Sequence, residues 1–419
     1  MNPVVEKRNL MTEIEAAFVK CGLGNDALRQ HAFGLFLKKG FPGLKSEEYK
    51  FTPITRILEK VIPTDLQPAP DTSPTSLDLV PDLACNVIVF VNGRFSKKDS
   101  IILDSSIELK LSQAGTAEPQ QDTFDLLNQA LTDSLVIVTV APGIQIQHPL
   151  AFVHYFDSPN FVLASPRWAC MVGRQSGLSI LEYTICRGET IYFNNKHSHV
   201  EVGEGAAVDF VTIQNGPKTD LMVNNSNLRL ASRSRASCFT FTFDGQLIRN
   251  NLTLSLDGEG IETHLYGLYL LSKNTIADNH TVVDHRKPNS NSNELYKGVM
   301  DGNSKGIFNG KIFVRPDAQK TNAFQSNRNI LLSETASINT KPQLEIWADD
   351  VKCSHGCTTG QMDEEALFYL RTRGISKEMA RGMMLHAFAA ETFVPLKHEA
   401  LKTFIEARVS NMLHNTLEL

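Results

Sequence analysis

Hydrophobic and polar residues change their spacing twice along the chain. Up to about residue 60, the segments TEIEAAFVKCG and ALRQHAFGLFLKKG place apolar residues at helical spacing, and each ends in Lys and Gly. From Leu135 to about Trp347, short alternating or β-branched runs follow one another, with Gly, Asn, Asp or Ser at the joins. From Asp363 onward the helical spacing returns. The pattern predicts a mainly β protein whose strand-rich centre lies between helical ends.

Two architectures accommodate so many short strands: a closed sandwich or barrel, and a solenoid of stacked coils. No fixed-period repeat is visible. Asparagine recurs, however, at positions that we assign to turns, and it tolerates left-handed backbone and stacks in ladders, as a β-solenoid requires. These observations favour the solenoid slightly. The asparagines concerned are Asn194, Asn195, Asn224, Asn225, Asn250, Asn251, Asn309, Asn327 and Asn329.

Composition narrows the class of protein. Of the 419 residues, 42% are hydrophobic and 21% charged, which is typical of a folded, soluble chain. A net charge of −5 gives no reason to expect nucleic-acid binding. No apolar stretch is long enough to cross a membrane. The seven cysteines are scattered and odd in number, which indicates reduced thiols and a cytoplasmic location.

Signatures of nucleotide and hydrolase chemistry are missing from the sequence. The segment GIFNGK (306–311) lacks the spacing of a phosphate-binding loop and lies between strand-like segments, with no helix to present its N–H groups to phosphate. Neither a G-x-S-x-G nor an H-E-x-x-H motif occurs. We therefore expect a protein that is not itself an enzyme.

Two histidine pairs are weak candidates for metal binding. His197 and His199 would point to the same face of a strand and could share an ion. His280 and His285 lie in the segment NHTVVDH. A solvated strand face explains the first pair better than a shared ion does.

The segment from Trp347 to Ile375, WADDVKCSHGCTTGQMDEEALFYLRTRGI, is richer in possible ligands. In an extended chain Cys353 and His355 face the same side, and Cys357 joins them if Gly356 does not end the strand. Thiolate and imidazole bind iron, zinc and copper. Three ligands are too few for a closed structural zinc site but suit a site that another chain completes. Structural thiols beside a surface histidine remain the alternative.

The C-terminal segment carries amphipathic helices. Asp363 and Ser376 are placed as N-caps, and Gly374 as the end of the first helix. An apolar stripe follows, either packed on the rest of the chain or presented to a partner. Its candidate partner-binding residues are Leu367, Phe368, Leu370, Met379, Met383, Met384 and Phe388.

Several motifs resemble the SufB/SufD family of iron–sulfur cluster assembly proteins, and its SufD members most. They are ADDVKCSHGCTTGQMDEEALFYLRTRGI, T-x-V-x-H at 281–285, Y-K-G at 296–298, F-N-G-K at 308–311, A-Q-K-T at 318–321, N-x-L-L at 329–332 and KSEEYKFTP at 45–53. The specific matches cover about a third of the chain. One departure is Cys357, where SufD chains commonly have a small residue such as Ala.

The resemblance implies a right-handed parallel β-helix core flanked by N-terminal and C-terminal helical regions. It implies pairing with the paralogue SufB and binding of the ABC-type ATPase SufC through the C-terminal helices. A nascent cluster or iron would be shared with SufB, with His355 and Cys353 as possible ligands and Cys357 as a weaker one. We expect an N-terminal region at 1–134, the β-helix at 135–352, and a C-terminal segment at 353–419 with the site and the docking helices.

Two other interpretations compete with the scaffold. A β-solenoid adaptor could dock the ATPase without metal ligands of its own, and a stand-alone metalloenzyme could use His280, His285 or His355. The sequence leaves open whether the complex holds a flavin and whether the isolated chain forms a homodimer.

Overall fold

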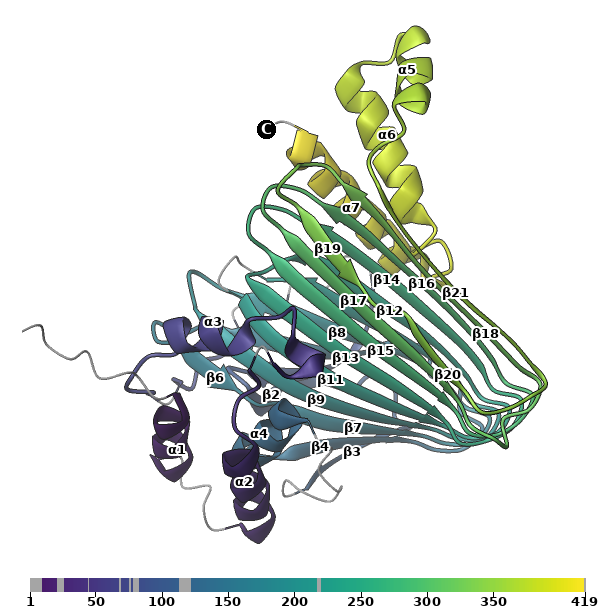
Figure 1. The fold of residues 1–419 in the computed structure, drawn as a ribbon. Coiled ribbons are helices and arrows are strands. Elements are labelled where there is room, and N and C mark those ends of the chain that lie inside the picture. Colours follow the sequence, from purple (N-terminus) through teal and green to yellow (C-terminus); the bar gives the residue numbers. More distant parts are fainter. Residues whose placement is uncertain are drawn as a thin grey trace, which may run out of the picture.

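Two facing sheets form the body of the protein. The computed structural model describes residues 10–20, 26–43, 45–67, 69–74, 77, 83–112, 122–216 and 220–417. From β7 to β18 successive strands alternate between sheet A and sheet B, and each strand pairs in parallel with the next strand of its own sheet. The chain therefore coils as a β-solenoid with helices at both ends of the sequence (Figure 1). The predicted mainly β solenoid is confirmed.

The strands of each sheet follow one another along the solenoid axis. Sheet A has the order β2 (Arg94–Ile101), β1 (Asn86–Val91), β5 (Leu150–Phe156), β8 (Gly177–Cys186), β10 (Ala207–Asn215), β12 (Arg235–Asp244), β14 (Glu262–Leu271), β16 (Asn291–Met300), β18 (Thr321–Leu331) and β21 (Val351–Gly360). Sheet B runs through β3 (Ile107–Ser112), β4 (Leu135–Val140), β7 (Arg167–Val172), β9 (Tyr192–Val202), β11 (Asp220–Leu230), β13 (Leu247–Leu256), β15 (Ile276–His285), β17 (Lys305–Val314) and β19 (Ser337–Thr340). Two short strands join it, β6 (Val162–Ala164) beside β9 and β20 (Gln343–Ile346) beside β17.

Stacked turns connect sheet B to sheet A on one side of the solenoid. One residue in each turn adopts a left-handed conformation, such as Gln175 (φ 57°), Arg233 (φ 58°) and Lys320 (φ 59°). Its N–H donates to a carbonyl of the next turn, as from Arg233 to Glu259 at 2.8 Å. Each turn thus satisfies the backbone of its neighbour, which offsets the cost of the strained conformation.

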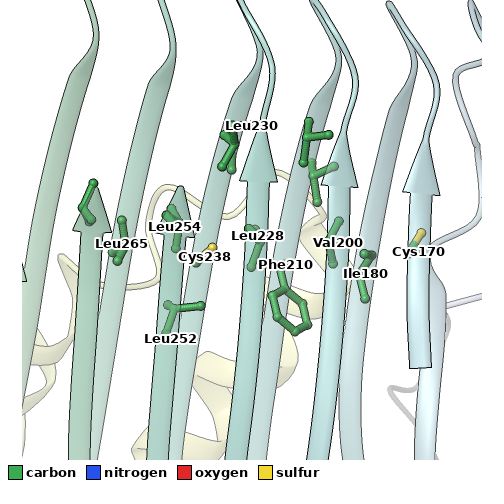
Figure 2. Close-up of a cluster of buried hydrophobic side chains, with 14 of the residues drawn as sticks. Cys170, Ile180, Val200, Phe210, Leu228, Leu230, Cys238, Leu252, Leu254 and Leu265 are labelled. Carbon is green, nitrogen blue, oxygen red and sulfur yellow. The ribbon is translucent and has the colours of Figure 1, made fainter. Parts of the chain in front are cut away.

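Apolar side chains from both sheets fill the interior. Val200, Leu228 and Leu254 of sheet B face Phe210 and Cys238 of sheet A, and all five are buried (Figure 2). Burying one such side chain contributes about 1.5–3 kcal/mol. This interior is the main core of the protein.

The asparagines lie in strands, so their predicted position at turns was wrong. Asn224, Asn250 and Asn279 occupy the same register position on β11, β13 and β15. Their side chains form a ladder, with Nδ2–Oδ1 distances of 2.7 Å from Asn224 to Asn250 and 2.9 Å from Asn250 to Asn279. The predicted stacking of asparagines is confirmed, because a buried amide finds its donor and acceptor on the neighbouring coils.

Helices cover the outer face of each sheet. The N-terminal helices α1 (Leu10–Lys20), α2 (Ala27–Lys39), α3 (Ile54–Val61) and α4 (Thr123–Leu131), with the short 3-10 helix η2 (Glu47–Tyr49), pack on sheet B. The C-terminal helices are α5 (Glu364–Thr372), α6 (Lys377–Ala390) and α7 (Glu399–Leu417). Residues of α6 and α7 pack on sheet A, whereas α5 and the start of α6 project beyond it (Figure 1).

The strand ladder continues past the boundaries expected from the sequence. β1 lies before residue 135, and β21 crosses the expected limit at 352/353. The two boundaries between the three expected regions stay predictions. Among the described helices, none has both the length and the apolar character needed to cross a membrane.

Candidate functional site at the open end of the solenoid

The last strand of sheet A carries the candidate ligands. β21 pairs in parallel with β18 through its whole length, with Cys353 opposite Ala323 and His355 opposite Gln325. In the order of sheet A, no strand follows β21 among the described residues, so its other edge is unpaired. Gly356 does not end this strand, which continues to Gly360.

Cys353, His355 and Cys357 form a row on one face of β21. Cys353 is half-buried and packs on the interior core, whereas His355 and Cys357 are exposed. Because alternate residues of a strand share a face, all three lie on the side of the interior. Burial raises the pKa of the Cys353 thiol, and an N–H from Ala323 acts in the opposite direction. The expected side-by-side arrangement is therefore present.

Spacing limits what this row can bind. Residues two apart on a strand are separated by about 6.6 Å. Within the described residues, no group of three or more His, Cys, Asp or Glu side chains is close enough to hold a metal ion. In this extended conformation a single ion cannot contact all three donors, so any ion bound here would need ligands from elsewhere.

Polar side chains occupy the interior directly beneath the row. Gln325, opposite His355, donates from Nε2 to Oε2 of Glu294 at 2.6 Å. Asn327, opposite Cys357, donates to the Tyr269 hydroxyl at 3.0 Å. Burial raises the pKa of Glu294 to about 7, although its polar neighbours Thr281 and Gln325 oppose the shift. The apolar core thus becomes polar at the end that carries the candidate site.

Two glycines of the sequence motifs leave room for these side chains. A Cβ added at Gly310 would overlap the amide of Gln325, and one at Gly298 would overlap the ring of Tyr269. The F-N-G-K and Y-K-G motifs therefore correspond to the packing of this polar interior. The segment GIFNGK forms part of β17, as its strand-like flanks predicted.

Within each of the two histidine pairs, the two side chains contact different residues. His197 Nδ1 lies 2.6 Å from Oδ1 of the buried Asp125, and His199 Nε2 lies 2.7 Å from Oε1 of Glu201. His285 is fully buried and contacts the Ser292 hydroxyl at 2.9 Å. Residues 280 and 285 fall on opposite faces of β15. Each histidine has its own partner, and neither pair forms a shared site.

Ion pairs and hydrogen bonds hold the KSEEYKFTP motif on the outer face of sheet B. Asp278 of β15 is fully buried and accepts from Arg249 at 2.5 Å and from Thr52. Glu48 lies 3.4 Å from His280 and 2.5 Å from Lys311, and these contacts lower the pKa of Glu48 to about 2, with the His280 hydrogen bond as the largest cause. The network ties the N-terminal segment to the last coils of the solenoid.

The C-terminal helices begin where the sequence predicts. The Asp363 side chain accepts from the N–H groups of Glu365 and Ala366, and the Ser376 hydroxyl accepts from Met379 N–H. Of the candidate partner-binding residues, Leu367 is buried and the others differ in exposure. Phe368, Met379 and Met383 are exposed, and Leu370, Met384 and Phe388 are half-buried.

Lys297 joins these helices to sheet A, and the sequence analysis did not single it out. It is buried on the outer face of β16, where its ammonium donates to Phe388 O at 2.8 Å and pairs with Glu391 at 2.9 Å. The ammonium also lies 4.5 Å from the centre of the Phe388 ring. Its place in the Y-K-G motif was the available signal. Glu294 and Gln325 were missed because they are isolated polar residues within strands.

Comparison with known proteins identifies the family. The SUF system iron–sulfur cluster assembly model, SufBD core domain, matches residues 154–388, more than half of the chain. The chain is 30% identical to the iron–sulfur cluster assembly protein SufD of Escherichia coli over 386 residues, 90% of each chain. It is 29% identical to a SufBD family protein of Synechocystis, covering 87% of this chain and 85% of that one. SufD of Bacillus subtilis is 26% identical over 79% of this chain and 75% of its own. The resemblance seen in the sequence is confirmed, and the chain belongs to the SufB/SufD family of iron–sulfur cluster assembly proteins.

Proposed function

We propose that this chain is a non-enzymatic scaffold subunit of an iron–sulfur cluster assembly complex. The observation that carries the proposal is the row of Cys353, His355 and Cys357 on an unpaired edge strand at the open end of the solenoid. His355 is the principal ligand offered to iron or to the nascent cluster, which are substrates of the assembly reaction. Cys353 contributes a second donor, and Cys357 a weaker one.

A SufB-type paralogue completes the site. Unpaired strand edges promote association with another chain. At the same end of the solenoid, large side chains are exposed: Phe324 is 44% exposed, Ile346 40% and Trp347 48%. A homologous end-to-end partner would cover these groups and supply the ligands that the row lacks.

A SufC-type ATPase docks on the C-terminal helices. Phe368 of α5 and Met379 and Met383 of α6 are exposed apolar side chains, which we take together as the apolar surface on α5 and α6. α5 and the start of α6 project from the solenoid (Figure 1). Met-rich surfaces adapt to partner helices. This partner supplies the nucleotide chemistry for which the chain has no motif.

Co-expression with SufB and SufC homologues of the same source, followed by anaerobic purification, tests the proposal. We expect one complex of three different chains that contains iron and acid-labile sulfide. A chain that co-purifies with neither partner would contradict the proposal. A complete complex whose iron content is unchanged when Cys353, His355 and Cys357 are all replaced by Ala would support the adaptor instead.

A further inference from the structure

A second candidate site lies on the opposite side of sheet B from the solenoid interior. A cavity of about 720 Å³ opens between the KSEEYKFTP segment and the last coil. Its lining includes Lys45, Lys50, His280, Asn309 and Lys341. A volume of this size is typical of sites for small organic ligands. The cavity is separate from the row on β21, which faces the interior and contributes no residue to its lining.

The last strand of sheet B is interrupted beside the cavity. β17 pairs with β19 only from Lys305 to Phe308, and with β20 only from Lys311 to Val314. Between these two segments, Asn309 and Gly310 face no strand partner on this edge. The register is the same on both sides of the gap, and Lys341 N–H donates to Phe308 O at 2.8 Å. Asn309 lies at this gap and lines the cavity.

Charge in the cavity favours an anion. Its two carboxylates already have cationic partners: Glu47 lies 2.6 Å from Lys341, and Glu48 lies 2.5 Å from Lys311. Lys45 and Lys50 have no ion-pair partner within the part of the chain that the structure describes. Both are exposed and line the cavity. Two ammonium groups are thus available to a ligand.

An unsatisfied carbonyl and an unsatisfied hydroxyl in the cavity wall offer hydrogen bonds to a ligand as well. Asn309 is only 5% exposed, and its Oδ1 has no hydrogen-bond partner. The Thr340 hydroxyl, also in the lining, is buried without a partner. A buried polar atom left unpaired destabilises the folded protein. A ligand hydroxyl would satisfy the Asn309 carbonyl while its anionic group meets the two lysines.

We propose that this cavity binds a hydroxylated small-molecule anion, either a sugar phosphate or a hydroxycarboxylate. The anionic group lies between Lys45 and Lys50, and a hydroxyl of the ligand donates to Asn309 Oδ1. The cavity lies on the outer face of sheet B, whereas the row on β21 belongs to sheet A and faces the interior. Binding in the cavity is therefore independent of the cluster site.

Calorimetric titration of the full chain, freed of metal by a chelator, tests this site with two probes. Ribose 5-phosphate represents the sugar phosphates, and citrate the hydroxycarboxylates. We expect one of the two to bind saturably at one site per chain, and more weakly as ionic strength rises. Which probe binds identifies the anion class. Failure of both to bind would overturn the proposal.

Matched variants separate the site from general electrostatics. Lys45→Ala/Lys50→Ala should weaken binding by about tenfold, which corresponds to about 1.4 kcal/mol for the two lost contacts together. Lys60→Ala/Lys97→Ala removes the same charge from exposed positions outside the cavity and should leave binding unchanged. Equal weakening by both pairs would contradict a specific site.

Asn309→Leu distinguishes a ligand contact from a packing role. Because its carbonyl has no partner in the free protein, we expect the thermal midpoint to stay the same or to rise. Binding of the probe should nevertheless weaken. A variant that loses stability and keeps full affinity would show that Asn309 serves the fold and not the ligand.

Discussion

Single side chains in the interior decide the character of the candidate site. Beneath β21, Glu294 and Gln325 share a hydrogen bond, but Glu294 Oε1 and Gln325 Oε1 are buried without partners. A carboxyl group in such surroundings is held in its neutral form more readily than in water. The unpaired polar atoms in this interior therefore reduce the stability of the fold. An ordinary core would be apolar, so polar groups here are better explained by a nearby functional site.

Glu294 should make stability depend on pH. Its folded pKa of about 7 lies above the ordinary value of 4.5. The folded state then binds more protons than the unfolded state between these values, so this group's contribution to stability is lost as pH rises from about 4.5 to 7. Glu294→Gln imitates the neutral form at all pH values. We expect the thermal midpoint of the variant, relative to wild type, to be higher at pH 8 than at pH 5. An equal difference at both pH values would show that Glu294 is not neutralised by burial.

Lys297 should determine how firmly α6 is held. Lys297→Ala removes the partner of Phe388 O and Glu391, and we expect a local loss of about 2 kcal/mol. Hydrogen exchange in α6 should become faster. The matched change Lys287→Ala removes an exposed pair with Asp317 at 3.7 Å and should leave exchange in α6 unaltered. Unchanged exchange in Lys297→Ala would mean that packing alone holds the helix.

At the scale of elements, the same coil is repeated along the solenoid. Each coil contributes a strand to each sheet, and side-chain ladders cross from coil to coil over 26 to 31 residues of sequence. The glycines of the F-N-G-K and Y-K-G motifs belong to this repeated coil, because larger side chains on neighbouring or facing strands fill the space they leave.

Gly310→Ala should disturb the polar interior. The added methyl group would overlap Gln325, and overpacking of this kind costs about 1–3 kcal/mol. A matched control is Gly356→Ala in β21, where nothing lies within 4 Å of the added Cβ. Thermal unfolding should show a lower midpoint for the first variant only. Equal midpoints would indicate that Gln325 moves aside freely.

The strands were predictable from the sequence, but their arrangement was predictable only in part. Short β-branched runs and turn residues indicate strands locally, and Asp363 and Ser376 indicate helix starts. Coil length varies between 26 and 32 residues, so no fixed period shows in the sequence. Polar residues such as Asn224 look like turn residues unless their partner 26 positions away is known. The row on β21 was found because its three donors are close in sequence, whereas Glu294 and Lys297 depend on distant partners.

At the scale of the whole molecule, the two proposed functional surfaces lie on neighbouring elements. β21 leads directly into α5, so the row of candidate ligands and the apolar surface on α5 and α6 are linked by a short segment (Figure 1). Lys297 and Arg328 on β16 and β18 both reach Glu391 at the end of α6, at 2.9 and 3.7 Å. Force applied to these helices by an ATPase would thus reach the strands next to the candidate site.

The apolar surface on α5 and α6 should be required for ATPase binding. Phe368→Asp and Met383→Asp place charge on this surface, so we expect at least about a tenfold loss of SufC affinity. Glu378→Gln, an exposed change on the same helix, is the control. Thermal unfolding should be unaffected in all three variants, because the altered side chains are exposed. Full SufC binding by both charged variants would place the docking surface elsewhere.

The most direct test of the account is the anaerobic absorption spectrum of the co-purified three-protein complex. Wild type is compared with His355→Ala and with Ser354→Ala, whose side chain points to the opposite face of β21. We predict that all three complexes assemble and that only His355→Ala loses the thiolate-to-iron bands. If His355→Ala assembles and keeps these bands at wild-type intensity, the row on β21 is not a cluster site and the chain acts as an adaptor for the ATPase.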